Sequence, residues 1–133
     1  MSGAKAGGSE PTHILVVEDD KELAVLIQRM LGTIGEVQMA ANGQEALALL
    51  QKGKPRFNLV VTDVAMPQMD GFQLSRSMKN DPVLSTIPVI MLTARTGPGD
   101  LISGINAGAR FYLTKPFRQS DLIAKAKKAL GKK

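Results

Sequence analysis

Charged and hydroxyl side chains follow several of the apolar runs in this sequence. Glu18 and Asp19 come directly after the first run, and Asp63 comes after a later one. Thr93 and Lys115 follow two further runs. Carboxylates held close together repel one another, and Mg²⁺ relieves that repulsion because it binds a few carboxylate oxygens, a carbonyl oxygen and water. These residue types in this order therefore indicate a magnesium site that can support phosphoryl transfer.

Each of the five side chains has a distinct expected role. Asp19 and Asp63 are expected to bind the ion directly, and Glu18 through a water molecule. Asp63 is also the expected nucleophile toward phosphorus, since a carboxylate beside a metal ion can form an acyl phosphate. Lys115 supplies a positive charge and Thr93 a hydroxyl donor for the oxygens of the transferred group.

Short apolar runs alternate with segments of helical periodicity. Strands are predicted at residues 13–17, 37–41, 57–62, 88–92 and 111–113, and the continuous apolarity of the first, third and fourth predicts burial on both faces. An apolar stripe predicts a first helix and consists of Leu23, Leu26, Ile27, Met30, Leu31 and Ile34. A second helix is predicted between a cap at Asn42 and a stop at Gly53. Three more are predicted at residues 71–80, from Gly97-Pro98 onward, and at residues 119–130.

This alternation predicts an α/β fold with one doubly wound, five-stranded parallel sheet and five flanking helices. The favoured strand order is 2-1-3-4-5, as in flavodoxin-like folds. Ligands of such sheets bind beyond the carboxyl ends of the strands, at the switch point between strands 1 and 3. The five candidate residues should therefore meet at one edge of the sheet.

Four motifs make the chain similar to a known family. They are residues 14–20 (ILVVEDD), 60–71 (VVTDVAMPQMDG), 89–94 (VIMLTA) and 112–117 (YLTKPF). In this order they resemble the receiver domain of bacterial two-component response regulators, over about residues 12–131.

The resemblance implies a role for each matching residue. Asp63 matches the phosphoacceptor, Glu18 and Asp19 the acids around Mg²⁺, and Ala65 the residue whose carbonyl completes the metal shell. Thr93 and Lys115 match the residues that contact the phosphoryl group. The aromatic switch residue corresponds to Tyr112, and the family implies a cis peptide bond between Lys115 and Pro116.

The implied function is that of a single-domain response regulator, which is a signalling protein and not an enzyme with a separate substrate. A sensor histidine kinase or a histidine phosphotransfer protein would supply the phosphoryl group in a Mg²⁺-dependent reaction. The chain would catalyse only its own phosphorylation and dephosphorylation. It would then signal to a downstream protein through the face formed by the fourth helix, fifth strand and fifth helix, here named the output face. No other cofactor is expected.

The sequence departs from the family pattern on the output face. Arg110-Phe111 stands where family members commonly carry two acids, and Arg95 is also basic. Lys125, Lys127 and Lys128 add positive charge and are interpreted as the solvated face of the last helix. A positive output face predicts either an acidic downstream partner or the loss of dimerisation through the usual charge pairs.

The predicted fourth helix contains residues that weaken it. Gly97, Gly99 and Gly104 lie at or inside it, and each interior glycine costs about 1 kcal/mol relative to alanine. Such glycines are expected either where a helix packs tightly on a sheet or where an element re-packs between two states.

The composition of the 133-residue chain excludes several other classes. The absence of cysteine excludes a disulfide framework and a cysteine nucleophile, and it fits a cytoplasmic protein. No apolar run is long enough to cross a membrane. Residues 1–11 are expected to form a disordered tail before a domain at residues 12–131. The net charge is +5, but the bases lack interleaved aromatic residues, so nucleic acid is not an expected partner.

Other interpretations fit the residues less well. A haloacid-dehalogenase-like phosphatase needs a second acid two residues after its nucleophile, where this chain has Ala65. A flavodoxin-like cofactor binder needs a phosphate-binding loop after the first strand, where acids stand instead. A receiver-like interaction domain that is not phosphorylated would not need the complete set of acids. The sequence does not separate a stand-alone regulator from a receiver domain excised from a larger protein.

Overall fold

A five-stranded parallel sheet forms the centre of the molecule, in the order β2-β1-β3-β4-β5. The computed structural model describes residues 11–66, 68–94 and 111–131. The strands are β1 His13–Val17, β2 Glu36–Ala40, β3 Leu59–Asp63, β4 Val89–Thr93 and β5 Phe111–Thr114. The helices within these ranges are α1 Lys21–Leu31, α2 Gly43–Lys52, α3 Gly71–Lys79 and α5 Gln119–Ala129, with a short 3₁₀ helix at Leu84–Thr86. The predicted strand order is confirmed.

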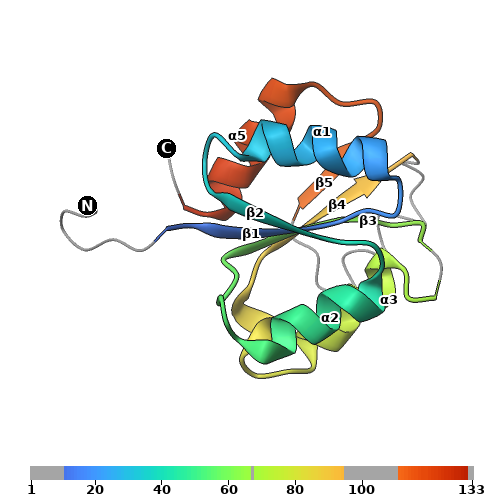
Figure 1. Ribbon diagram of the computed structural model, residues 1–133, viewed down its shortest axis with the longest axis vertical. Coiled ribbons are helices and arrows are strands. Elements are labelled where there is room, and N and C mark those ends of the chain that lie inside the picture. The colour runs from blue at the N-terminus through green and yellow to red at the C-terminus, as the bar shows by residue number, and fades with distance from the viewer. Residues whose placement is uncertain (1–10, 67, 95–110, 132–133) are drawn as a thin grey trace.

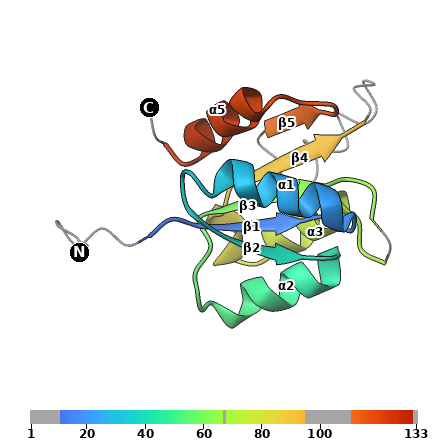
Figure 2. The same ribbon diagram turned by 45° about the horizontal axis from the view of Figure 1, so that its top comes forward.

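Helices cover both faces of the sheet. Figure 1 shows α1 and α5 on one side and α2 and α3 on the other, and Figure 2 shows the strands running between these layers. The core is accordingly divided into two clusters. One lies under α1 and α5 and includes Ile27 and Leu122, and the other lies under α2 and α3 and includes Leu50 and Leu74. This is the expected three-layer doubly wound architecture.

The three central strands are buried on both faces, as their apolarity predicts. All residues of β3 and β4 are buried, and so is all of β1 except its first residue. β2 is different, because it lies at the edge of the sheet and only its last residue, Ala40, is buried. The central position of β1, β3 and β4 fixes the end of each of these strands firmly in space.

Side-chain caps fix where the helices begin. The carboxylate of Asp20 accepts hydrogen bonds from the first turn of α1, and the amide oxygen of Asn42 accepts one from Glu45 N–H at the start of α2. Asp70 and Gln73 form a reciprocal capping box at the start of α3. Gly53 ends α2 with φ +69°, a left-handed conformation that glycine adopts without strain.

Several details differ from the sequence prediction. Strand boundaries shift by one or two residues, and β3 extends to include Asp63 itself. Leu26 belongs to the predicted buried stripe of the first helix but is 46% exposed. Lys125 and Lys127 are half-buried, whereas Lys128 is exposed, so only part of the predicted solvated lysine face is confirmed. The physical reason is that α5 packs against α1 as well as against the sheet.

Some predictions fall on residues that the structure does not describe. They are the fourth helix from Gly97-Pro98 with its three glycines, the basic residues Arg95 and Arg110, and the tail at residues 1–10. Within the described residues, no helix is both long and apolar enough to span a bilayer.

The cap at Asn42 gives a direct test of the local structure. Asn42→Ala removes the oxygen that accepts the Glu45 N–H at 2.9 Å, and we expect the free energy of unfolding to fall by about 1 kcal/mol. Asn42→Asp keeps an acceptor oxygen and should lose little. Urea unfolding of the three proteins measures both effects, and an equal loss in both variants would contradict the capping role.

Candidate functional site

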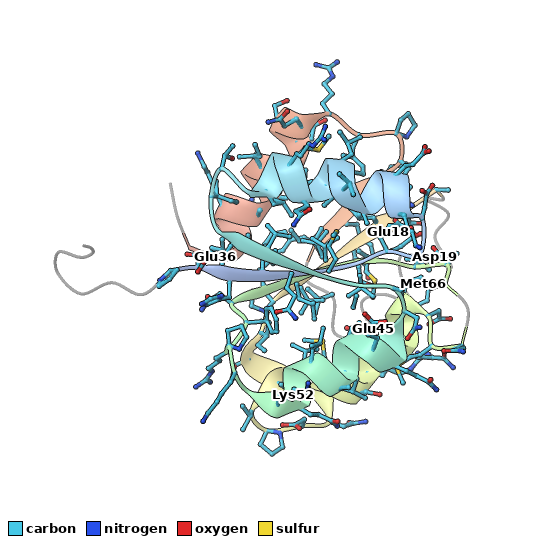
Figure 3. All side chains as sticks on the ribbon, viewed as in Figure 1. Glu18, Asp19, Glu36, Glu45, Lys52 and Met66 are labelled. Atoms are coloured by element: carbon cyan, nitrogen blue, oxygen red, sulfur yellow. The ribbon has the colours of Figure 1, made fainter. Side chains whose placement is uncertain are left out.

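The carboxyl ends of the central strands bring the predicted site residues to one edge of the sheet. Glu18 and Asp19 directly follow β1, and Asp63 is the last residue of β3, which pairs in parallel with β1. Figure 3 shows Glu18 and Asp19 at the same end of the molecule as Met66, while Glu36 marks the opposite end. The parallel register therefore brings together acids that lie more than forty residues apart in the sequence.

Three carboxylates form a compact cluster at this edge. One oxygen from each of Glu18, Asp19 and Asp63 lies within 4.8 Å of the others. Glu18 and Asp63 are buried, with 4% and 8% of their surfaces exposed, whereas Asp19 is exposed. An all-oxygen donor set of this kind suits a hard cation such as Mg²⁺, which retains water on its open side.

Lys115 connects two of these carboxylates. Its ammonium nitrogen lies 3.1 Å from Oδ2 of Asp63 and 3.4 Å from Oε1 of Glu18. The Lys115 N–H donates to the carbonyl oxygen of Thr93 at 2.8 Å, and the peptide bond to Pro116 is cis, as predicted. Burial lowers the pKa of Lys115, but the hydrogen bond and charge of Asp63 outweigh it and the net pKa is raised. The side chain is therefore a fixed positive charge.

The environment of Glu18 favours its protonated form. Burial is the main cause, and the negative charge of Asp63 adds to it. A hydrogen bond from the Asp20 N–H and the charge of Lys115 act in the opposite direction. The balance raises the pKa of Glu18 from its ordinary value of 4.5 to about 7. Neutralising the negative charge of this site, with a proton or with a bound cation, is thus favourable.

Thr93 and Tyr112 lie on the two strands beyond Asp63. Thr93 ends β4 with 9% of its surface exposed, and β4 pairs with β3 so that Leu92 stands opposite Asp63. Tyr112 lies on β5, where it is partly buried against the core beneath α2 and α3. Burial raises the pKa of its hydroxyl. Thr93 thus ends the strand next to β3, and Tyr112 lies one strand further from Asp63.

The loop between β3 and α3 presents Ala65, whose position is exposed. The N–H of Val64 donates to Leu92 O at 3.0 Å, and the Gly71 N–H returns to Val64 O at 2.9 Å. These two hydrogen bonds fix both ends of the loop next to Asp63. Figure 3 shows Met66 of this loop at the same end of the molecule as Asp19.

Sequence reasoning did not find two features of the site. The first is the ion pair of Lys115 with Glu18, since the lysine was assigned only to a phosphoryl group. The second is the contact of Gly43 with Met69, which joins α2 to the β3–α3 loop. The burial of Glu18 was readable from its position directly after the apolar run Ile14–Val17, but no sequence signal points to Gly43.

Comparison with known proteins identifies the family. The sequence profile of the response regulator receiver domain matches residues 14–127. The chain therefore belongs to the receiver domain family of two-component signalling. Receiver domains are signalling domains that histidine kinases phosphorylate, and they bind Mg²⁺ at an acidic site.

Individual relatives agree with this assignment. The chain is 36% identical over 121 residues to the response regulator MprA of Mycolicibacterium vanbaalenii. The match covers 90% of this chain and 51% of that protein. The chain thus spans about half the length of the curated relatives that it matches first. The chemotaxis protein CheY4 of Vibrio cholerae superposes with a TM-score of 0.84 at 33% identity, covering 91% of this chain and all of that one.

A third relative bears on the acidic cluster. The receiver domain of the sensor histidine kinase PA1611 from Pseudomonas aeruginosa has a TM-score of 0.82 at 28% identity, over 92% of this chain and 99% of that one. That structure has a magnesium ion coordinated in its active-site cleft.

The raised pKa of Glu18 predicts a specific pH dependence of the metal-free protein. The folded state keeps the proton of Glu18 up to about pH 7, whereas the unfolded state releases it near 4.5, so stability falls as the pH rises through this window. Glu18→Gln removes that fall. Its gain in unfolding free energy over the parent should therefore be larger at about pH 8 than at about pH 5.

Urea unfolding in the presence of a chelator measures this difference. Glu22→Gln, at an exposed position of α1, controls for the loss of one negative charge. An identical gain for Glu18→Gln at both pH values would show that the buried carboxyl does not titrate as described.

Proposed function

We propose that this chain is the phosphoacceptor module of a two-component pathway and that Asp63 carries the phosphoryl group. One observation carries the proposal. Asp63 is the last residue of a buried strand, beside two further carboxylates, and Lys115 lies 3.1 Å from its side chain. One small site thus offers a carboxylate that can act as the nucleophile, carboxylate oxygens that can bind a cation, and a fixed positive charge.

The three carboxylates are the proposed ligands of Mg²⁺. Asp19 and Asp63 would bind directly, Glu18 through water, and the Ala65 carbonyl would complete the protein's share of the coordination shell. The donor set fits, because every available group is an oxygen and the cluster holds more negative charge than Lys115 neutralises. The bound ion would supply positive charge to the phosphoryl oxygens during transfer.

The transfer itself is an in-line displacement at phosphorus. A carboxylate oxygen of Asp63 forms the new P–O bond as the bond between phosphorus and the donor's imidazole nitrogen breaks, and the released imidazole takes a proton from solvent. Lys115 neutralises charge on the transferred oxygens, and the Thr93 hydroxyl donates a hydrogen bond to one of them. These two residues also hold the product on Asp63.

The signal would leave the site through β4 and β5. Thr93 and Tyr112 are the proposed switch pair, with the hydroxyl drawn toward the phosphoryl group and the ring moving inward behind it. Three lysines of α5 give the described part of the output face a positive charge, namely Lys125, Lys127 and Lys128. An acidic downstream protein is therefore the proposed partner.

The curated relatives are longer than this chain, which bears on whether the receiver acts alone or as part of a larger protein. The chain spans about half of the response regulator MprA, so that protein has a further region beyond its receiver. The proposed chemistry applies equally to a stand-alone regulator and to the receiver of a larger protein, because every residue proposed for the site lies within this domain. Ala65 provides no second acid for phosphatase chemistry.

A groove beside the site fits a docking surface for the phosphodonor protein. Its lining comes from α1 and from the segment after β5, and consists of Leu23, Leu26, Met30, Lys115, Pro116 and Phe117. Leu26 leaves 46% of its surface exposed, so an apolar part of the groove lining is open to a partner. Because Lys115 belongs both to the groove and to the acceptor site, a protein seated here would be beside Asp63.

The central test is phosphorylation by a small donor. We expect the parent chain to gain the mass of one phosphoryl group on incubation with Mg²⁺ and acetyl phosphate, and Asp63→Asn to gain none, because the amide is not a nucleophile. Intact-mass spectrometry gives the readout. A parent that stays unmodified, or an Asp63→Asn variant that gains as much as the parent, would overturn the proposal.

Docking at the groove can be tested separately, because it should affect transfer from a protein donor and not phosphorylation by a small molecule. Leu26→Ala should slow transfer from a phosphorylated histidine phosphotransfer protein by about tenfold, the usual effect of truncating an apolar anchor. Phosphorylation by acetyl phosphate should be unchanged, because Leu26 does not touch the carboxylates. Val25→Ala is the matched control, since Val25 is also exposed on α1 but does not line the groove. Equal slowing by the two variants would argue against docking at this groove.

A further inference from the structure

Two glycines contact the loop that connects β3 to α3. This loop follows Asp63 and includes Ala65, and its residues 64–66 and 68–70 are described. Gly71 begins α3 at one end of the loop, and Gly43 begins α2 on the neighbouring helix. Both glycines are buried. The atoms nearest to a Cβ added at either glycine do not include a carboxylate of the acidic cluster.

Gly71 lies directly against the backbone of the phosphoacceptor. A Cβ atom built on Gly71 would overlap the carbonyl oxygen of Asp63 and would lie 3.1 Å from the Cα of Val64 and from the sulfur of Met91. The same carbonyl oxygen accepts a hydrogen bond from the Thr62 hydroxyl at 3.0 Å. A side chain at Gly71 would therefore force the main chain at Asp63 and the start of α3 apart, because the overlapping atom is a backbone oxygen and not the end of a flexible side chain.

Gly43 contacts the same loop at Met69, two residues before Gly71. Its N–H donates to Met69 O at 3.2 Å, and a Cβ at this position would lie 2.6 Å from that oxygen and 2.7 Å from Cγ of Met69. Real Cβ atoms do not approach a neighbour so closely, so the loop and the start of α2 would have to move apart. Because glycine has no side chain, the N-termini of α2 and α3 can both pack closely against this loop.

Backbone conformation does not explain these glycines. Both lie at the first position of an α-helix, where the backbone is open to any residue, whereas Gly53 and Gly131 have the positive φ that favours glycine. At Gly53 and Gly131 an added Cβ would meet nothing within 4 Å. Close contact with the loop is therefore the physical requirement at Gly43 and Gly71.

We propose that Gly71 and Gly43 are positioning residues for the metal and phosphoacceptor site. Gly71 sets the main-chain position of Asp63, and Gly43 sets the position of the loop that carries the Ala65 carbonyl. Alanine at either position moves oxygen ligands without changing any ligand. The inference rests on the proposed Mg²⁺ site, and its test separates the two.

The test compares Gly71→Ala and Gly43→Ala with Gly35→Ala. Gly35 lies at the opposite edge of the sheet, where an added Cβ would be 2.7 Å from the carbonyl oxygen of Thr12, so it controls for a backbone clash of the same kind. All three variants should unfold at lower urea concentration. The Mg²⁺ dissociation constant, measured by titration of the folded proteins, should rise about tenfold for Gly71→Ala and several-fold for Gly43→Ala. For Gly35→Ala it should stay at the parent's value.

Amide NMR spectra of the metal-free proteins give a readout that does not need the ion. The resonances of Asp63, Val64 and Ala65 should move in Gly71→Ala and stay in place in Gly35→Ala. Unmoved resonances, or parental Mg²⁺ affinity in both loop variants, would overturn the inference. If Gly71→Ala does not fold, Gly43→Ala decides by the same two criteria. A parent that binds no Mg²⁺ would contradict the proposed function, while the NMR comparison would still decide the positioning role.

Discussion

The burial of two carboxylates beside one lysine is the interaction on which the site depends. Glu18 and Asp63 are almost fully covered, at the ends of two strands whose residues are buried almost throughout. Removing such charges from water is costly unless nearby groups compensate for it, and Lys115 compensates only in part, because the pKa of Glu18 remains raised to about 7. The site therefore favours added positive charge, which the proposed divalent cation would provide.

The doubly wound sheet creates this concentration of charge. Parallel strands place all their carboxyl ends at one edge, and the order β2-β1-β3-β4-β5 places β1 and β3 next to each other. Lys115 approaches the acids from the side of β4, because its backbone N–H is hydrogen-bonded to Thr93 O at the end of that strand. Two apolar clusters on opposite faces hold the strands in register. Packing remote from the site thus determines how closely the charges lie.

Much of this arrangement could be predicted from local patterns. Apolar runs predicted β1, β3 and β4 as buried strands, and the motif residues predicted which side chains would meet. Leu26 shows where such patterns fail, since its helical spacing predicts burial although a groove beside Lys115 leaves it exposed. The contact of Gly43 with Met69 was equally unpredictable. It depends on how closely α2 packs against the loop before α3, and these two segments are far apart in the sequence.

The sequence by itself determined the order of strands and helices, the family, and the identity of the acids and the lysine at the strand ends. These follow from side-chain chemistry and from periodicity, which are local properties of the chain. Only the tertiary structure decided that Lys115 bridges Glu18 and Asp63, that Glu18 holds its proton to about pH 7, and that Gly71 lies against the Asp63 carbonyl. Distances and burial between remote segments set these features, because electrostatic and steric energies depend on separations that only packing fixes.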